Sequence, residues 1–149
     1  MNRIFVSTTF AADDSKVSDV LQLCEEHNFF NLELGSNHAY EEDFERIVGK
    51  YAFQYLVHNY FPIPKDSFIL NIASMDDGIR QRSINHVFQA IDFSERIGAG
   101  LYTFHPGFLT DPLGSNLDSN NYDFQFRDEL IHLDKPSQAF ERLVSAITD

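Results

Sequence analysis

Apolar residues recur along the chain in two alternating patterns, short continuous runs and stripes of helical spacing. The runs are rich in β-branched and aromatic residues and are bounded by turn residues, which is typical of buried strands. The stripes place apolar residues three and four positions apart, as on one face of a helix. The predicted strands are residues 4–10, 31–35, 54–58 and 101–105, and the predicted helices are residues 17–24, 40–51, 77–97 and 136–147.

The two longest helical stripes also predict which side chains are buried. In the helix 77–97, which ends before Gly98, the spacing predicts a buried face that consists of Ile84, Val87, Phe88 and Ile91. In the last helix, which Pro136 opens, the corresponding face consists of Phe140, Leu143, Val144 and Ile147.

Two segments follow neither pattern. Residues 68–72 are apolar and extended, and they fit either a short hairpin or the tail of the third strand–helix unit. Residues 108–134 are rich in Asn, Asp and Ser, and we expect a long loop there. A loop of that length is uncommon in a compact domain and often has a function.

Four alternations of strand and helix predict parallel strands joined by right-handed crossovers. An open doubly wound sheet and part of an eight-stranded barrel both fit this order. The first strands lack the glycine-rich phosphate loop of a nucleotide-binding doubly wound sheet, which disfavours that version. Barrel enzymes carry their chemistry at the carboxyl ends of the strands. Polar residues stand at those ends here, namely Thr8, Thr9, Glu33, His58 and His105. Because a full barrel needs ~250 residues, we expect an α/β chain whose residues 1–149 form the parallel (βα)4 half of a TIM (β/α)8 barrel.

The amino-acid composition limits the classes of partner that the chain is expected to bind. The 149 residues include 11 basic and 23 acidic side chains, a formal charge of −12. Nucleic-acid binding needs basic residues, so we expect no nucleic acid, although the charge also fits a role in solubility alone. The single cysteine, Cys24, lies on an apolar stripe and is expected to be a buried thiol. No apolar run has the length of a membrane span, and a cytoplasmic protein is expected.

Two histidines are the strongest candidates for chemistry. His58 and His105 each close an apolar strand, and strand ends of one barrel converge on one rim. Neutral imidazole binds zinc, manganese or iron and serves as an acid or base near neutral pH. The alternative is that both imidazoles only cap loops by hydrogen bonds. The remaining histidines, expected to be solvated, are His27, His38, His86 and His132.

Further polar residues near the strand ends are candidate sugar contacts. We expect Glu33 to contact substrate hydroxyls or a partner on the barrel floor, although a solvated carboxylate fits equally well. The substrate-binding candidates are Glu33, Asn59, Tyr60 and Asn71, with Asp76 as a further polar neighbour. Asn and Tyr beside prolines are also common turn and packing residues. No residue is assigned as a catalytic base.

Several short motifs occur in an order that is similar to the order found in a known family of proteins. They are Val57-His58-Asn59-Tyr60, Leu70-Asn71-Ile72-Ala73-Ser74, Arg82-Ser83-Ile84, Gly98-Ala99 and Phe104-His105-Pro106-Gly107. The chain resembles the xylose isomerase-like barrel superfamily, which includes sugar-phosphate isomerases and epimerases and the endonuclease IV type of abasic-site nuclease. The resemblance implies that His58 and His105 belong to a divalent metal site for Zn, Mn, Mg or Fe. It also implies that carboxylate ligands come from strands five to eight, which this chain does not supply.

Three functions remain open. The first is the N-terminal part of a metal-dependent sugar or sugar-phosphate isomerase or epimerase, inactive by itself. The second is an endonuclease IV-like phosphodiesterase, which the acidic charge and the segment inserted at residues 61–69 disfavour. The third is a non-catalytic assembly module, in which the open barrel face pairs with a second copy to form a homodimer.

Overall fold

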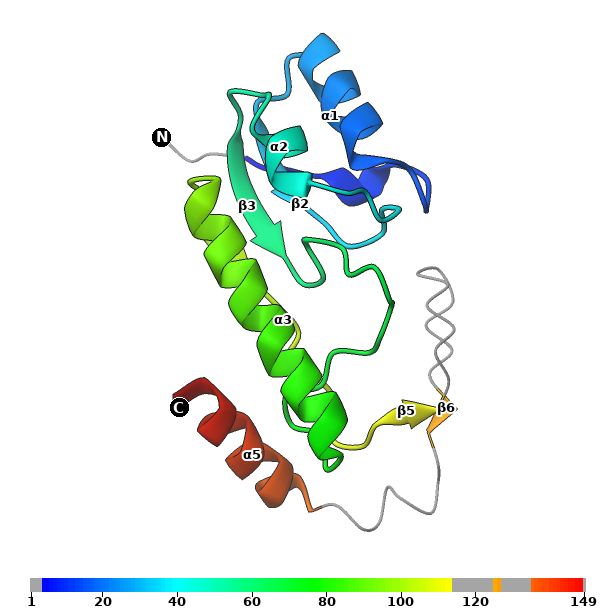
Figure 1. The fold of residues 1–149 in the computed structure, drawn as a ribbon, viewed down its shortest axis with the longest axis vertical. Helices are drawn as coiled ribbons and strands as arrows, with labels where there is room; N and C mark the ends of the chain where they lie inside the picture. Colours follow the sequence, from blue (N-terminus) through cyan, green and yellow to red (C-terminus); the bar gives the residue numbers. More distant parts are fainter. Residues whose placement is uncertain (1–3, 114–124, 127–134, 149) are drawn as a thin grey trace. The chain divides into compact units, whose positions relative to one another are not determined.

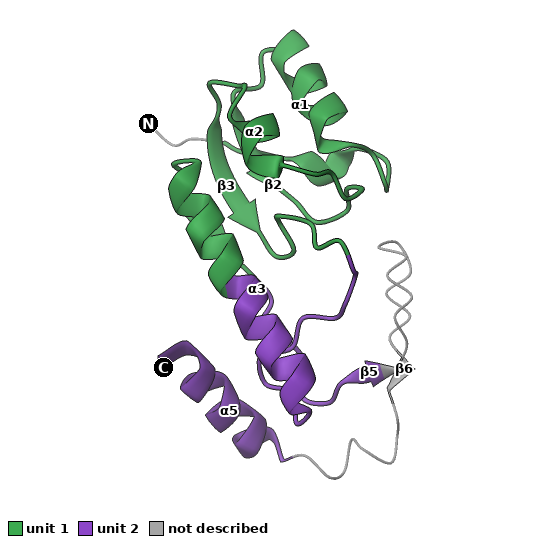
Figure 2. Ribbon diagram, in the orientation of Figure 1, with its two compact units in different colours: residues 1–65, 88–104 green, residues 66–87, 105–149 purple. Residues whose placement is uncertain are grey.

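The computed structural model of the protein describes residues 4–113, 125–126 and 135–148. The chain divides into two compact units (Figure 2). Unit 1 comprises residues 1–65 and 88–104, and unit 2 comprises residues 66–87 and 105–149. Each unit is held by its own contacts.

Unit 1 is built on a four-stranded parallel sheet. Its strands lie in the order β1-β2-β3-β4, and each pairs in parallel with the next. The two central strands, β2 and β3, are labelled in Figure 1. The strands are β1 (Val6–Ser7), β2 (Asn31–Leu34), β3 (Gln54–His58) and β4 (Tyr102–Thr103). Helices α1 (Val17–Glu26) and α2 (Phe44–Val48) connect β1 to β2 and β2 to β3. The predicted parallel α/β arrangement is therefore confirmed.

The two faces of the sheet differ in polarity. Leu32, Leu34, Tyr55 and Val57 alternate along β2 and β3 on the buried face. This face packs against the apolar side of the helices. The remaining buried members of this core are Val17, Val20, Leu21 and Cys24 of α1, Phe44, Ile47 and Val48 of α2, and Phe61 and Phe93. The buried Cys24 matches its prediction, and burial raises the pKa of its thiol.

The first strand is shorter than its apolar run predicts. Only Val6 and Ser7 pair with β2, and residues Thr8–Phe10 form a 3-10 turn, η1. Side-chain bonds explain the change, because Ser7 Oγ and Thr9 Oγ1 lie 2.9 Å apart and Thr8 Oγ1 accepts a hydrogen bond from the amide of Gly35. Hydroxyls that bond locally offer the backbone an alternative to the sheet.

Unit 2 contains the first part of α3 (Asp77–Arg96), the antiparallel pair β5 (Pro112–Leu113) and β6 (Gln125–Phe126), and α5 (Pro136–Thr148). The expected loop 108–134 thus includes a two-stranded sheet; residues 108–111 are irregular, and residues 114–124 and 127–134 lie outside the described residues. Residues 68–72 form no strand; instead Leu70–Ser74 are buried in an irregular segment. The helix predicted at residues 136–147 is confirmed as α5.

The buried face of α3 was predicted wrongly. Phe88 and Ile91 are 56% and 46% exposed. The residues that α3 buries are Ser83, His86, Ala90, Phe93 and Ser94. The two serine hydroxyls donate to carbonyls of their own helix, Ser83 to Ile79 at 2.8 Å and Ser94 to Ala90 at 2.7 Å. Those bonds remove the desolvation cost of burying a hydroxyl, so a small polar face can be buried.

The apolar face predicted for α5 is also not buried. Phe140, Val144 and Ile147 are exposed, and Ala139 is the buried residue of this helix. Arg142 on α5 donates from Nε to the carbonyl of Ala73 at 2.7 Å, which fixes the helix to the irregular segment of unit 2. Helical spacing therefore located α5 correctly but did not predict which of its faces is covered.

Candidate functional site at the carboxyl end of the sheet

The face of the sheet opposite the core carries polar side chains. In parallel strands, paired residues point to the same side, and the register pairs Ser7 with Glu33 in one row. His58 of β3 pairs with Thr103 of β4. Because Leu56 pairs with Glu33 and lies two residues before His58, both pairs belong to the same face. We call Ser7, Glu33, His58 and Thr103 the polar sheet face.

Strand geometry brings these groups within reach of one small molecule. A rise of ~3.3 Å per residue and a strand spacing of ~4.8 Å put the Cα atoms of Glu33 and His58 about 8 Å apart. Long side chains can converge across that separation. A carboxylate, an imidazole and hydroxyls together can bind a polyol and exchange protons with it.

Contacts to β4 fix the orientation of His58. Its Nδ1 lies 2.9 Å from Thr103 Oγ1. The next residue, Asn59, turns the chain in the left-handed region with φ 53°, and its amide donates to the carbonyl of Thr103 at 2.7 Å. The hydroxyl of Tyr102 donates to the carbonyl of Asn59 at 2.9 Å. Burial raises the pKa of Tyr102, so this hydroxyl stays protonated as a donor.

A buried polar link joins the ends of β1 and β2. Thr8 Oγ1 accepts the amide hydrogen of Gly35 at 3.0 Å and lies 2.7 Å from His38 Nε2. His38 Nδ1 lies 3.3 Å from the carbonyl of Ser15, an acceptor, so Nδ1 carries the proton and Nε2 accepts from Thr8. His38 is 4% exposed. The prediction that it is solvated was therefore wrong, as it was for His86, which is also 4% exposed and packs edge-on to the ring of Phe68.

The neutral state of His38 predicts a pH dependence of stability. Burial lowers the pKa of His38 against smaller opposing effects from the Ser15 carbonyl and the Glu41 charge. The folded protein thus binds this proton less readily than the unfolded chain. We expect the free energy of unfolding to fall as the pH drops below about 6.5, until the lowered pKa is passed.

Urea denaturation between pH 5 and 8 measures this effect. In His38→Gln the overall stability should be lower but this acidic slope should be reduced, whereas His27→Gln, at an exposed position, should keep the slope. An unchanged slope in His38→Gln would contradict the assignment.

Asn71 is the central polar residue of unit 2. It is completely buried, and its side-chain oxygen accepts the amides of Ala73 at 3.1 Å and Phe108 at 3.2 Å. Its Nδ2 donates to Asp111 Oδ1 at 2.7 Å. The other oxygen of Asp111 accepts from Ser74 Oγ at 2.5 Å. Asn71 therefore holds the segments around Ala73 and Phe108 together.

The structure distributes the predicted site residues over both units. Glu33, His58 and Asn59 lie at the end of β2 and β3 in unit 1, where Tyr60 follows as a partly buried residue. Asn71 and the exposed His105 belong to unit 2. The pairing of His58 with His105 stays a prediction. Sequence reasoning missed Ser7 and Thr103, whose side chains become recognisable only once the strand register is known.

The side chains that could act as metal ligands in the described residues form only part of a metal site. Within residues 4–113, 125–126 and 135–148, no group of three or more His, Cys, Asp and Glu side chains is placed to hold a metal ion. The contact between His58 Nδ1 and Thr103 Oγ1 is the kind of outer contact that orients a ligating imidazole. His58 therefore suits a ligand role, provided that other groups complete the coordination.

Comparison with known proteins agrees with the fold. The four-stranded parallel sheet and its helices are the (βα)4 half of a TIM barrel. The chain is similar to the solved structure of a D-tagatose 3-epimerase-like protein, with a TM-score of 0.59 and 19% sequence identity. The likeness covers 96% of this chain and 45% of that one, so the chain spans less than half the length of its structural neighbour. No protein-family model and no curated protein matches the sequence.

Among the described residues, no helix combines enough length with enough apolar character to cross a membrane.

Proposed function

We propose that the chain forms one half of a metal-dependent sugar or sugar-phosphate isomerase or epimerase. The observation that carries this proposal is the polar sheet face, where Glu33 and His58 stand on one side of the sheet near the strand ends. In TIM barrels this is the end at which catalysis takes place. The similarity to an epimerase-like structure supports the same class of reaction.

The proposal gives separate roles to the side chains. His58 and His105 are the metal ligands of this half, and carboxylates that this chain does not supply complete the coordination. The metal, when bound, polarises a substrate oxygen as a Lewis acid. Glu33 accepts hydrogen bonds from substrate hydroxyls, and the side-chain amide of Asn59 donates to them. Asn71 acts indirectly, because its amide is buried and bonded, and it positions the segment that leads to His105.

The charge of the chain supports a small substrate over a nucleic acid. The formal charge of −12 repels a phosphate backbone, whereas a single sugar needs only local hydrogen bonds. We therefore favour the sugar enzyme over the metal-dependent phosphodiesterase.

Metal titration tests the proposed ligands. We expect Zn²⁺ binding, measured by isothermal titration calorimetry, to weaken at least about tenfold in His58→Asn and in His105→Asn, because each change removes one ligand. Thr103→Val should weaken it about tenfold through the orientation of His58. His27→Asn, at an exposed position on another part of the chain, is the control.

Two outcomes would contradict the ligand assignment. The first is equal affinity in the wild type and both histidine variants. The second is a loss in His27→Asn as large as the loss in His58→Asn.

A further inference from the structure

Asn37 joins the loop that follows β2 to the loop that follows β1. Its side-chain nitrogen, Nδ2, lies 3.2 Å from Asp13 Oδ1 and 3.2 Å and 3.4 Å from the carbonyl oxygens of Ala11 and Thr9. Three acceptors around this atom identify it as the nitrogen, because an oxygen in its place would face only other oxygens. The amide orientation is therefore fixed, and with it the position of the side-chain oxygen, Oδ1.

Two oxygen atoms at this junction are buried without a hydrogen-bond donor. They are Asn37 Oδ1 and Asp13 Oδ2, and neither has a partner among the described residues. Each is two bonds of about 1.2–1.3 Å away from the atom through which its own group makes the contact between the two side chains. The two oxygens therefore border the same contact. Buried acceptors are costly unless a donor or a cation satisfies them.

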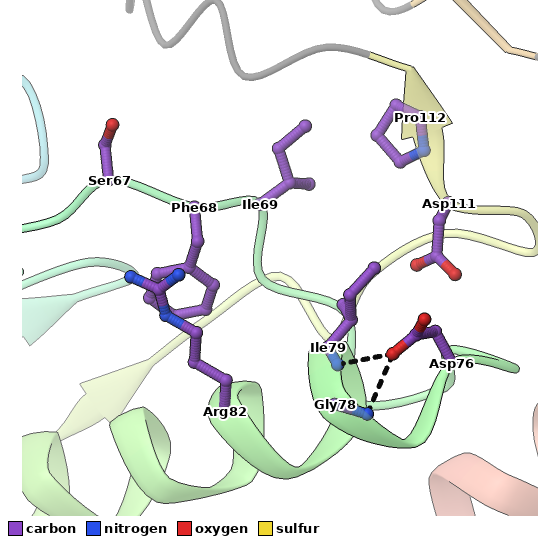
Figure 3. A pocket seen from close by; sticks show the side chains of 9 residues that line it. All are labelled: Ser67, Phe68, Ile69, Asp76, Gly78, Ile79, Arg82, Asp111 and Pro112. Atoms are coloured by element: carbon purple, nitrogen blue, oxygen red, sulfur yellow. Dashed lines mark hydrogen bonds between the residues drawn. The ribbon is translucent and has the colours of Figure 1, made fainter.

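The carboxylate that caps α3 shows how such a group is usually satisfied. Asp76 Oδ1 accepts the amides of Gly78 at 2.8 Å and Ile79 at 3.0 Å (Figure 3). Asp13 Oδ2 has no comparable amide, and none of the ion pairs between described residues includes Asp13. A buried carboxylate oxygen in this situation favours the binding of a cation from solution.

The chemistry of the two donors indicates the kind of cation. Both are hard oxygen donors, which suit alkali and alkaline-earth ions better than zinc or iron. Only the carboxylate of Asp13 carries a charge, and the described residues contain no group of three or more His, Cys, Asp and Glu side chains that could hold a metal ion. One carboxylate balances one positive charge, so a monovalent ion leaves the buried site neutral.

Backbone bonds between the two loops hold the donors in place. The amide of Asp14 donates to the carbonyl of Asn37 at 3.0 Å, and the amide of Ala39 donates to the carbonyl of Ser15 at 3.1 Å. Residues 8–15 and 35–39 both belong to unit 1, so the junction lies within one compact unit. A site that is formed before binding loses little conformational entropy when the ligand arrives.

We propose that Asp13 Oδ2 and Asn37 Oδ1 bind a monovalent alkali cation, Na⁺ or K⁺. The ion ties the loop after β1 to the loop after β2, and water and backbone carbonyls supply the rest of its coordination. Neither residue belongs to the polar sheet face, so the inference does not rest on the proposed function.

Thermal unfolding in different chloride salts tests the site. At equal ionic strength, the midpoint should be higher in sodium or potassium chloride than in tetramethylammonium chloride, whose cation is too large to fit between two converging oxygens. The midpoint should also rise with the concentration of the small cation, because binding to the folded state alone stabilises it. Asp13→Asn should abolish the difference between the salts, since loss of the charged ligand raises the dissociation constant at least about tenfold.

Asp14→Asn is the matched control. It removes the same charge from the next residue, whose side chain is exposed, and asparagine tolerates the φ of 60° at this position. This variant should keep the difference between the salts that the wild type shows, whereas a general salt effect would be the same in all three proteins.

Sodium NMR gives a readout that does not depend on unfolding. The wild-type protein should broaden the sodium signal, added K⁺ should reverse the broadening, and Asp13→Asn should broaden it less than Asp14→Asn does. Equal wild-type midpoints in all three salts, or an unchanged salt response in Asp13→Asn, would overturn the inference and assign the two oxygens to a bound water or a proton. Stabilisation by calcium chloride with none by sodium chloride would overturn the assignment to a monovalent ion.

Discussion

Replacing Asn71 with leucine is expected to lower the free energy of unfolding by about 3–5 kcal/mol. Leucine is of similar size, but it cannot accept the amides of Ala73 and Phe108 or donate to Asp111. Each buried group that loses its partner costs about 1–3 kcal/mol. The loss is large because three groups depend on one completely buried side chain. It stays toward the lower end of three such losses because the bonds to Phe108 and Asp111 are only partly buried.

Urea denaturation followed by circular dichroism measures the change for Asn71→Leu. The matched control is Asn85→Leu on the exposed side of α3, where the side-chain oxygen accepts from Gln81 at 3.0 Å. Surface changes of this kind stay within about 0.5 kcal/mol. A loss below about 1 kcal/mol in Asn71→Leu would show that the buried network contributes little to stability.

Gly107→Ala is expected to destabilise the same unit by about 2–6 kcal/mol. Gly107 has φ +129°, a backbone region that is essentially restricted to glycine and costs other residues about 1–3 kcal/mol. An added Cβ would also lie against Asn71 Oδ1 and 2.6 Å from Asn71 Cα. Overpacking of a filled interior costs about 1–3 kcal/mol more. The glycine of the His-Pro-Gly motif is therefore explained by the close approach of Asn71.

Gly100→Ala provides the control for this substitution. A Cβ at Gly100 would meet no atom within 4 Å, and the residue is not among those with positive φ. Alanine there should be neutral or should stabilise the protein by about 0.4–1 kcal/mol, since it restricts the unfolded chain. Thermal unfolding of the two variants side by side gives the comparison. Equal midpoints would refute the predicted contact between Gly107 and Asn71.

The sequence predicts the order of strands and helices well because each depends on local periodicity. The run Gln54–His58 is an example, since buried residues alternate with exposed or partly buried ones as in a strand with one buried face. The buried side of α3 could not be predicted in this way. Ser83 and Ser94 are buried because their hydroxyls bond to carbonyls one turn earlier, and hydrophobicity gives no sign of that bond.

The candidate site was predictable to a similar extent. A histidine at the end of an apolar strand points to His58, but Thr103 becomes its neighbour only through the register of β3 and β4. A polar residue enclosed by Leu70 and Ile72 could have indicated that Asn71 is buried. Its partner Asp111 is 40 residues away in sequence, and no local pattern connects them.

Helix α3 has a consequence for the cooperativity of folding. Its residues up to Val87 belong to one unit and those from Phe88 onward to the other, yet the helix runs without a break from Asp77 to Arg96. Ending a helix in its middle would leave carbonyls and amides without partners. We therefore expect that loss of structure in one unit frays α3 toward the other, and that the two parts of the helix unfold together.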